Sequence, residues 1–354
     1  MARFYTILII LFSSALFLSA CSAGSDDTAS ESDNGSGEGL DESLMPGETE
    51  PAKGIGEPVT LRLPMGYIPD PQYAPYYVAV EKGYFAEEGI ILEFDYSFET
   101  DGIALVGAGE LPFAVVSGEQ VLLARAQGLP VVYVFEWFQR FPIAVISKAG
   151  SEIEEPADLA GRTVGLPGFF GASYVGYAGL LAASGLTEDQ VQATDIGFTQ
   201  IESLLTDQVE AVVGYVNNEP LQIENQGQDV NVIMVADAAD LVANGIISNE
   251  ETIANNPELV SGFLKALVRG LTDTLADPDE AFEISKKYVE ALDDNRKNVL
   301  MASLDLWNAQ PLGLSEISSW EKTQQVLLDI GFLDSPLEDL ESVFTNEFIS
   351  LDRP

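Results

Sequence analysis

Short apolar runs that alternate with segments of helical spacing constrain the fold of this chain most strongly. Strands are predicted at residues 59–63, 91–96, 112–116, 130–135, 142–147, 163–165, 193–196, 211–215 and 230–235. Helices are predicted between them at 76–82, 102–106, from 117 onward, 173–184 and 201–206. After about residue 252 the pattern changes to long helices, including 320–330 and 337–348. Strands that alternate with helices in this way predict mostly parallel sheets flanked by helices, which is an α/β fold.

The length of the chain indicates more than one lobe. Its 354 residues, of which 46% are hydrophobic, can build a sizeable core. Two series of alternating strands and helices, followed by a helical tail, predict two α/β lobes. No repeat of fixed period is present in the sequence.

The N-terminus has the features of a secretory signal. Arg3 precedes an apolar stretch that begins near Phe4 and ends in Leu18-Ser19-Ala20, directly before the single cysteine, Cys21. This stretch is too short to span a bilayer comfortably. A cysteine at the cleavage position resembles the lipobox of bacterial lipoproteins, which implies removal of residues 1–20 and lipidation of Cys21. The alternative is an ordinary signal peptide that happens to contain a cysteine.

Residues 21–57 are rich in Ser, Gly, Asp and Glu and offer almost nothing to bury. Such a segment cannot offset the entropy lost on ordering, so we predict a disordered acidic linker. The mature protein would then be a cell-membrane lipoprotein on the extracytoplasmic face, tethered through its acyl chains alone.

Composition excludes several classes of function. The chain has no histidine, and no cysteine besides Cys21, so catalysis by Ser-His-Asp or Cys-His groups is excluded and zinc sites are disfavoured. Its 57 acidic against 16 basic residues repel nucleic acid and anionic ligands. We therefore expect a neutral or cationic ligand, no enzyme activity, no metal and no cofactor. Arg140 is the arginine that we expect nearest to a site.

Four segments carry a resemblance to a known family. They are Tyr76–Ile90, Gly109–Ala114, Leu159–Gly165 and Asn249–Leu259. In this order they resemble type II periplasmic substrate-binding proteins of the family related to thiamine-pyrimidine synthesis proteins. Pro112 departs from the pattern, since the family has an aspartate there. The similarity extends over essentially everything from Val59 onward.

The resemblance implies a two-lobed receptor that closes on its ligand and delivers it to an ABC permease and its ATPase. Lobe I would comprise 58–146 and 247–354, and lobe II 147–246. Two hinge strands, near 144–148 and 245–248, would join the lobes, and the protein would be a monomer. Fungal members of the family are enzymes that depend on histidine and a cysteine-rich segment, neither of which is present in this chain.

Ligands of α/β lobes bind outside the carboxyl ends of strands, so the loops after the predicted strands contain the candidate site. The candidate ligand-binding residues are Tyr67, Asp70, Gln72, Tyr73, Ser117, Gln120, Trp137, Gln139, Phe169, Tyr174, Tyr215, Asn217 and Glu219. Aromatic rings among polar side chains favour a flat heterocycle with a hydrogen-bonding edge. The resemblance singles out Glu219, because pyrimidine binders of the family carry a glutamate in a similar Asn-x-Glu setting.

Several of these residues also have a purely structural interpretation. Ser117 and Gln120 have the spacing of a helix capping box. Trp137 fits simple packing, and either Phe169 or Phe170 is expected in the core. Glu219 could be a solvated loop residue.

Two ligands agree with the pattern. The number of aromatics and amides favours riboflavin, and the sequence as a whole resembles the riboflavin-binding receptors of the family. The alternative is a pyrimidine precursor of thiamine, either formylaminopyrimidine or hydroxymethylpyrimidine. A lipid-anchored surface hydrolase that uses two carboxylates is a remote third possibility.

Overall fold

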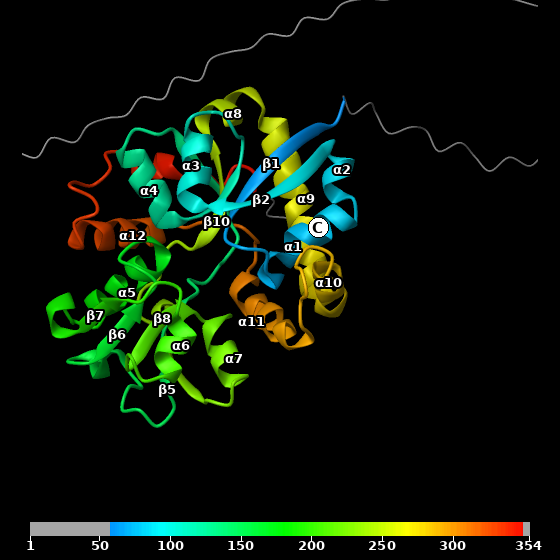
Figure 1. The fold of residues 1–354 in the computed structure, drawn as a ribbon. Coiled ribbons are helices and arrows are strands. Elements are labelled where there is room, and N and C mark those ends of the chain that lie inside the picture. The colour runs from blue at the N-terminus through cyan, green and yellow to red at the C-terminus, as the bar shows by residue number, and fades with distance from the viewer. Residues whose placement is uncertain (1–56, 350–354) are drawn as a thin grey trace, which may run out of the picture. The chain divides into compact units, whose positions relative to one another are not determined.

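Three sheets form the framework of residues 57–349, the part of the chain that the computed structural model describes (Figure 1). The first pairs β1 (Val59–Gly66) in parallel with β2 (Ile90–Phe98). In the second, β10 (Asn244–Asn249) lies between β3 (Ala114–Ser117) and β4 (Val131–Glu136). The third has the order β7 (Gln192–Asp195), β6 (Thr163–Leu166), β8 (Ala211–Tyr215), β5 (Ile143–Lys148) and β9 (Val230–Met234). The predicted signal peptide, Cys21 and nearly all of the linker lie outside the described residues.

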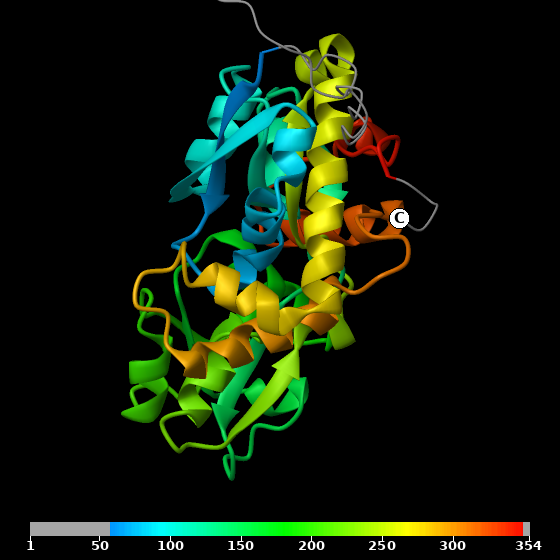
Figure 2. The same cartoon turned by 90° about the vertical axis from the view of Figure 1, so that its right-hand side faces the viewer.

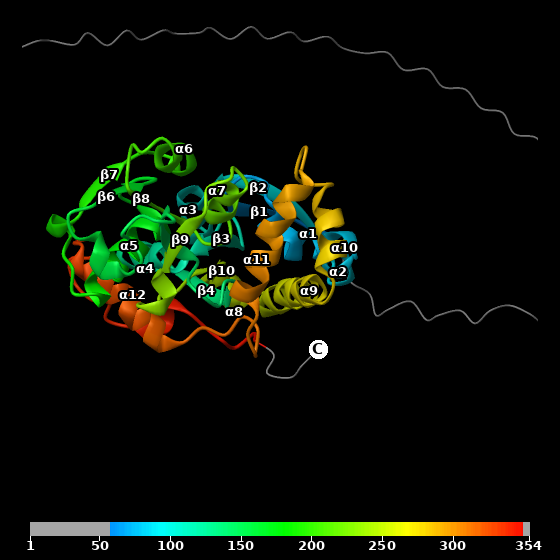
Figure 3. The same ribbon diagram turned by 90° about the horizontal axis from the view of Figure 1, so that it is seen from below.

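Helices connect and cover these sheets. They are α1 (Ala74–Glu81), α2 (Tyr84–Glu87), α3 (Glu99–Gly107), α4 (Gly118–Ala126), α5 (Gly171–Ala183), α6 (Gln200–Leu205), α7 (Glu219–Glu224), α8 (Glu250–Asn255), α9 (Pro257–Ala276), α10 (Pro278–Ser285), α11 (Lys297–Trp307) and α12 (Ile317–Asp329). The long helix α9, yellow in Figure 2, packs beside α1. Figure 3 shows α7 next to α11, where the Asn217 amide donates to the Ser303 hydroxyl over 2.8 Å.

One strand in each larger sheet runs against the others. β3 and β4 are both antiparallel to β10, so they are parallel to one another. In the five-stranded sheet β5 is antiparallel to β8 and β9, and the remaining strands share one direction. The prediction of mostly parallel α/β sheets is thus confirmed. Strands β3, β4, β5, β8 and β10 are buried along almost their whole length, which explains their nearly continuous apolar sequences.

The chain passes between the two larger sheets twice. It leaves the three-stranded sheet after Glu136 and enters the five-stranded sheet at Ile143. It returns between Met234 and Asn244. The predicted hinge positions coincide with the reversed strands β5 and β10, whereas the passages themselves lie just before each strand. The predicted lobe boundaries stay a prediction.

Two local expectations were wrong. Residues 337–348 form no long helix, since only a short 3₁₀ turn is present at Leu340–Val343. Tertiary contacts override the helical spacing there: Phe344 stacks on Trp320 at 5.7 Å, and Thr345 donates its N–H to the Tyr133 carbonyl over 2.9 Å. Ser117 precedes α4 but its side chain makes no capping bond, so the predicted capping box with Gln120 is also wrong.

Gly245 is fixed by the close approach of β4. A Cβ atom at this position would lie 2.1 Å from the Tyr133 hydroxyl and 2.3 Å from the Phe135 carbonyl. The Tyr133 hydroxyl is itself held by a hydrogen bond to the Ala243 carbonyl over 3.0 Å. Neither group can move without breaking the packing of β10.

We expect Gly245→Ala to lower the free energy of unfolding by about 3 kcal/mol, because overpacking forces backbone shifts. Urea unfolding followed by tryptophan fluorescence measures this change. Gly262→Ala in α9 is the matched control: the nearest atom to its new Cβ would be Glu88 Cβ at 3.3 Å, a far milder contact than at Gly245, and alanine favours the helix by up to about 1 kcal/mol. Equal destabilisation by both substitutions would contradict the claim that the close approach of β4 requires glycine at position 245.

Candidate ligand-binding site

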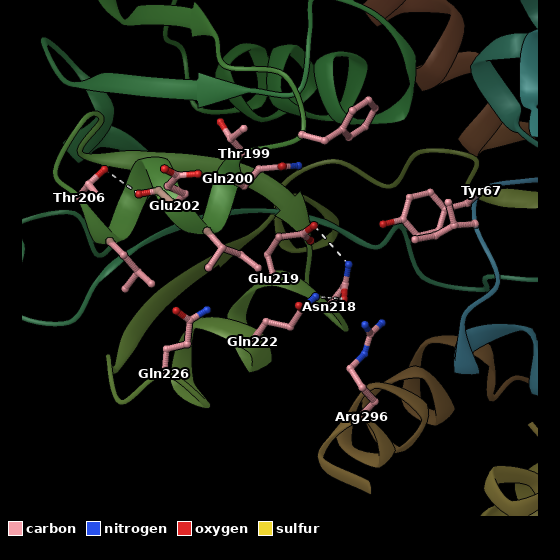
Figure 4. A pocket seen from close by; sticks show the side chains of 14 residues that line it. Tyr67, Thr199, Gln200, Glu202, Thr206, Asn218, Glu219, Gln222, Gln226 and Arg296 are labelled. Atoms are coloured by element: carbon pink, nitrogen blue, oxygen red, sulfur yellow. Dashed lines mark hydrogen bonds between the residues drawn. The ribbon is translucent and has the colours of Figure 1, made fainter. Parts of the chain in front are cut away.

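A pocket of about 680 Å³ lies between the end of β1 and the helices α6 and α7 (Figure 4). Tyr67 and Ile68 line it from the loop after β1, and Arg296 lines it from the turn before α11. The rest of the lining comes from residues 198–206 and from α7 with its flanking residues. Its size is in the range of sites that bind small organic molecules.

Glu219 is the first residue of α7 and forms the acidic centre of the pocket. It is 9% exposed, so it is a buried helix residue and not the solvated loop glutamate of the alternative interpretation. Its Oε2 accepts the Tyr215 N–H over 2.7 Å, and its Oε1 accepts from the Asn218 amide over 3.3 Å. A Cβ on Gly214 would lie 2.7 Å from Oε2, so a larger residue there would displace the carboxyl group of Glu219. Burial raises the pKa of Glu219 to about 7.

Tyr67 and Arg296 face Glu219 from the opposite wall (Figure 4). Tyr67 is 39% exposed, and partial burial together with the negative charges of Glu219 and Asp70 raises its pKa to about 12. Its hydroxyl therefore stays protonated in neutral solution. The guanidinium of Arg296 forms an ion pair with Asp70, which is buried at the start of a 3₁₀ turn and also accepts the Gln72 N–H over 3.0 Å.

A second acidic group lies at the ends of β2 and β3. The Ser117 hydroxyl lies 2.7 Å from Glu99 Oε2 and 2.5 Å from Glu119 Oε1. One hydroxyl proton cannot serve two acceptors, so one of the two contacts requires a proton on a carboxyl group. Burial and the nearby charge of Glu119 raise the pKa of Glu99 to about 7, and burial raises the pKa of Glu119. The pair therefore binds a shared proton near neutral pH.

This acidic pair is connected to the five-stranded sheet. The amide of Asn244, on β10, donates to Glu99 Oε1 over 2.9 Å. The hydroxyl of Tyr215, at the end of β8, donates to Asn244 Oδ1 over 3.4 Å. The network therefore extends from the pair to the strand end beside Glu219, whose carboxylate accepts the backbone N–H of Tyr215.

The structure brings several predicted site residues together. Tyr67 and Glu219 line the pocket, and Asp70 holds Arg296 at its edge. Ser117, Tyr215 and Gln120 belong to the neighbouring network, where the Gln120 amide donates to Glu119 Oε1 over 3.2 Å. Asn217 is buried and bonds Ser303 of α11, and Gln72 contributes its backbone N–H to Asp70.

Other predicted residues are packed elsewhere. Tyr73 and Trp137 are buried and stacked at 5.5 Å, and Trp137 stacks on Trp307 at 5.7 Å, so the packing interpretation of Trp137 is confirmed. The Tyr73 hydroxyl donates to the Met65 carbonyl over 2.7 Å. The side chain of Gln139 donates to the Glu136 carbonyl.

The aromatic residues at the start of α5 make their own contacts. Tyr174 bonds Glu188 over 2.7 Å, and Phe169 contacts its ring edge-on at 5.6 Å. Neither lines the pocket. Phe169 and Phe170 are 47% and 61% exposed, so the expectation that one is in the core was wrong.

Arg140, the arginine expected nearest to a site, does not line this pocket, and it forms an ion pair with Asp237 at an exposed position. Sequence reasoning missed Arg296, Glu99, Glu119 and Phe198. Phe198 follows the end of β7, so the strand-end rule could have found it. Arg296 lies in a helical region far along the chain, and no pattern in the sequence marks it.

Comparison with known proteins agrees with this architecture. The periplasmic aliphatic sulphonate binding protein SsuA from Escherichia coli superimposes with a TM-score of 0.68 at 15% identity, covering 82% of this chain and 99% of that one. The described residues therefore have the fold of periplasmic substrate-binding proteins. Within residues 57–349, every helix is too short or too polar to cross a membrane.

Sequence similarity then gives the family. The chain is 43% identical to the riboflavin-binding protein RibY of Chloroflexus aurantiacus, over 81% of this chain and 85% of that protein. It is 29% identical to the formylaminopyrimidine-binding protein of Halalkalibacterium halodurans, over 81% and 91%. Residues 70–281 match the family described as NMT1/THI5 like. The chain belongs to this NMT1/THI5-like family, which confirms the resemblance stated from its motifs.

The buried carboxyls give stability a definite pH dependence. The pKa values of Glu99 and Glu219 are raised to about 7 and that of Glu136 to about 8, and Glu119 is shifted in the same direction. Their neutral forms stabilise the folded state, so stability is lost as pH rises from the unfolded pKa through these folded values. We expect the free energy of unfolding to fall by at least about 2 kcal/mol between pH 5 and pH 8.

Glu119→Gln should make this fall shallower, because it leaves Glu99 without a negative neighbour. Glu110→Gln, at an exposed position, should leave it unchanged. Chemical unfolding at a series of pH values measures the slope. Stability that rises between pH 5 and pH 8, or equal slopes for both variants, would contradict the shared proton.

Proposed function

We propose that this protein is the extracytoplasmic, lipid-anchored binding component of an ABC importer, and that it binds riboflavin in the pocket beside Glu219. The observation that carries the proposal is the 43% identity to a riboflavin-binding protein along most of both chains. The chain then acts as a binding protein and not as an enzyme. A permease and its ATPase would be its partners, and the protein would act as a monomer.

The chemistry of the pocket supports an uncharged flavin. Apolar side chains offer contact for a flat ring system, namely Tyr67, Ile68, Phe198, Ile201 and Leu205. Neutral polar side chains suit the hydroxyl groups of a ribityl chain, namely Thr199, Gln200, Asn218, Gln222 and Gln226. Glu219 can accept the imide N–H of the dioxopyrimidine ring. A charged phosphate would meet the field of Glu202 and Glu219.

A thiamine pyrimidine precursor is the second candidate. The 29% identity to a formylaminopyrimidine-binding protein favours it, and Glu219 could equally accept from an amino group. A single pyrimidine ring would leave much of a 680 Å³ pocket to water. Riboflavin would fill the same pocket with its ring system and its ribityl chain together.

Fluorescence titration tests the ligand directly. Riboflavin stacked on aromatic rings should lose its fluorescence when the purified protein is added. Glu219→Ala should weaken binding about tenfold, since it removes a buried hydrogen-bond acceptor of the pocket. Glu224→Ala is the matched control, because it is exposed on the same helix and does not line the pocket.

Unchanged flavin fluorescence, together with calorimetric binding of formylaminopyrimidine, would contradict the proposal and favour thiamine salvage. An equal loss of affinity in both variants would contradict the placement of the site.

The lipid anchor has its own test. Cys21→Ala should move the protein from the membrane fraction to the soluble fraction, because each buried CH₂ of an acyl chain contributes about 0.8 kcal/mol to membrane binding. Ser22→Ala is the control and should stay with the membrane. Cell fractionation followed by immunoblotting gives the readout, and a Cys21→Ala protein that still sediments with membranes would contradict the anchor.

A further inference from the structure

Arg296 is the only lysine or arginine that lines the pocket between residues 57 and 349. Its guanidinium is held by Asp70, whose side chain is 3% exposed. The Nε atom of Arg296 is buried and makes no hydrogen bond to the described residues. A buried donor without a partner is costly, so the side chain of Arg296 has hydrogen-bonding capacity that the described part of the protein does not use.

The position of the guanidinium is well defined. Asp70 is fixed by the Gln72 N–H and by its place at the start of a 3₁₀ turn, so it orients the arginine through Nη2. Figure 4 shows the guanidinium pointing toward Asn218 and Glu219 across the pocket. An arginine presents several N–H donors in one rigid plane, so those not used by Asp70 are available to an acceptor.

The local charge determines which acceptor fits. Asp70 offsets the charge of Arg296, and Glu219 adds negative charge opposite it. Burial raises the pKa of Tyr67 most, the charges of Glu219 and Asp70 raise it further, and the charge of Arg296 lowers it, so the four side chains are close enough to interact electrostatically. A phosphate would therefore gain little binding energy here, because the carboxylates repel it. A neutral carbonyl oxygen can accept a strong hydrogen bond from Arg296 without charge repulsion.

We infer, on the basis of the proposed function, that Arg296 is a specificity-determining residue that donates to a carbonyl oxygen of the dioxopyrimidine ring of the flavin. Glu219 accepts the imide N–H next to that carbonyl. The two side chains thus recognise adjacent acceptor and donor groups of one ring edge from opposite walls of the pocket. The ribityl chain then lies toward the amides of α6 and α7, and flavin mononucleotide gains nothing from its phosphate.

Three ligands and four variants test this assignment. Riboflavin, lumichrome (which keeps the ring edge but has no ribityl chain) and flavin mononucleotide are titrated by fluorescence. Arg296→Met removes the donors, and Arg296→Lys keeps the charge but loses the planar fork. The double variant Arg296→Met with Asp70→Asn avoids leaving a buried carboxylate unpaired. Lys297→Met is the control, since Lys297 pairs with Asp279 and does not line the pocket.

We expect Arg296→Met and the double variant to weaken the binding of riboflavin and of lumichrome by the same factor, about tenfold or more. The affinity of Arg296→Lys for riboflavin should lie between that of these variants and that of the parent, and the affinity of the Lys297→Met control should match the parent. Flavin mononucleotide should bind no more tightly than riboflavin. Parent-like riboflavin affinity in the double variant would overturn the inference. A loss of affinity for riboflavin but not for lumichrome would also overturn it, because Arg296 would then contact the ribityl chain. Tighter binding of flavin mononucleotide than of riboflavin would overturn it as well.

The binding measured for the parent protein distinguishes failure of this inference from failure of the proposed function. If the parent does not bind riboflavin at all, the proposed function is overturned and the inference with it. If the parent binds riboflavin and the Arg296 variants bind it equally well, only the inference is overturned.

Discussion

The shortage of cations is the constraint on which the site depends. Each lysine and arginine of residues 57–349 forms an ion pair, and Asp70 is the only deeply buried carboxylate among their partners. The buried acids Glu119 and Glu219, and the partly buried Glu99, must therefore be stabilised by protons, hydroxyls and backbone N–H groups. Burial without a counter-charge raises the pKa values of Glu99 and Glu219 to about 7, so these two carboxyl groups are partly protonated at physiological pH despite the acidity of the chain.

The fold places these groups together through its strand ends. Tyr67 follows β1, Glu99 follows β2, Ser117 ends β3 and Tyr215 ends β8. Asn244 begins β10, the reversed strand by which the chain returns from the five-stranded sheet, and it bonds both Glu99 and Tyr215. The acidic pair thus lies at the junction of the two sheets and is connected through Asn244 and Tyr215 to the pocket residue Glu219.

The sequence predicts the framework well because strand and helix signals are local. Alternating runs located β1 and β2, apolar runs located the buried strands, and the strand-end rule selected Tyr67 and Glu219, which line the pocket. The failures have a tertiary cause. Tyr73 and Trp137 follow strands as the pocket residues do, but they are buried in a stack in which Trp137 also contacts Trp307. Trp307 belongs to α11, which is far away in the chain. Arg296 could not be found because its role depends on Asp70, more than two hundred residues earlier.

A crystal structure of the riboflavin complex tests the central claim most directly, namely that an uncharged ring is held between Tyr67 and the partly protonated Glu219. The account predicts electron density for the isoalloxazine ring in that pocket, with its imide edge at the Glu219 carboxyl group. Density for the ring at another position, such as against Phe169 and Tyr174, would contradict it.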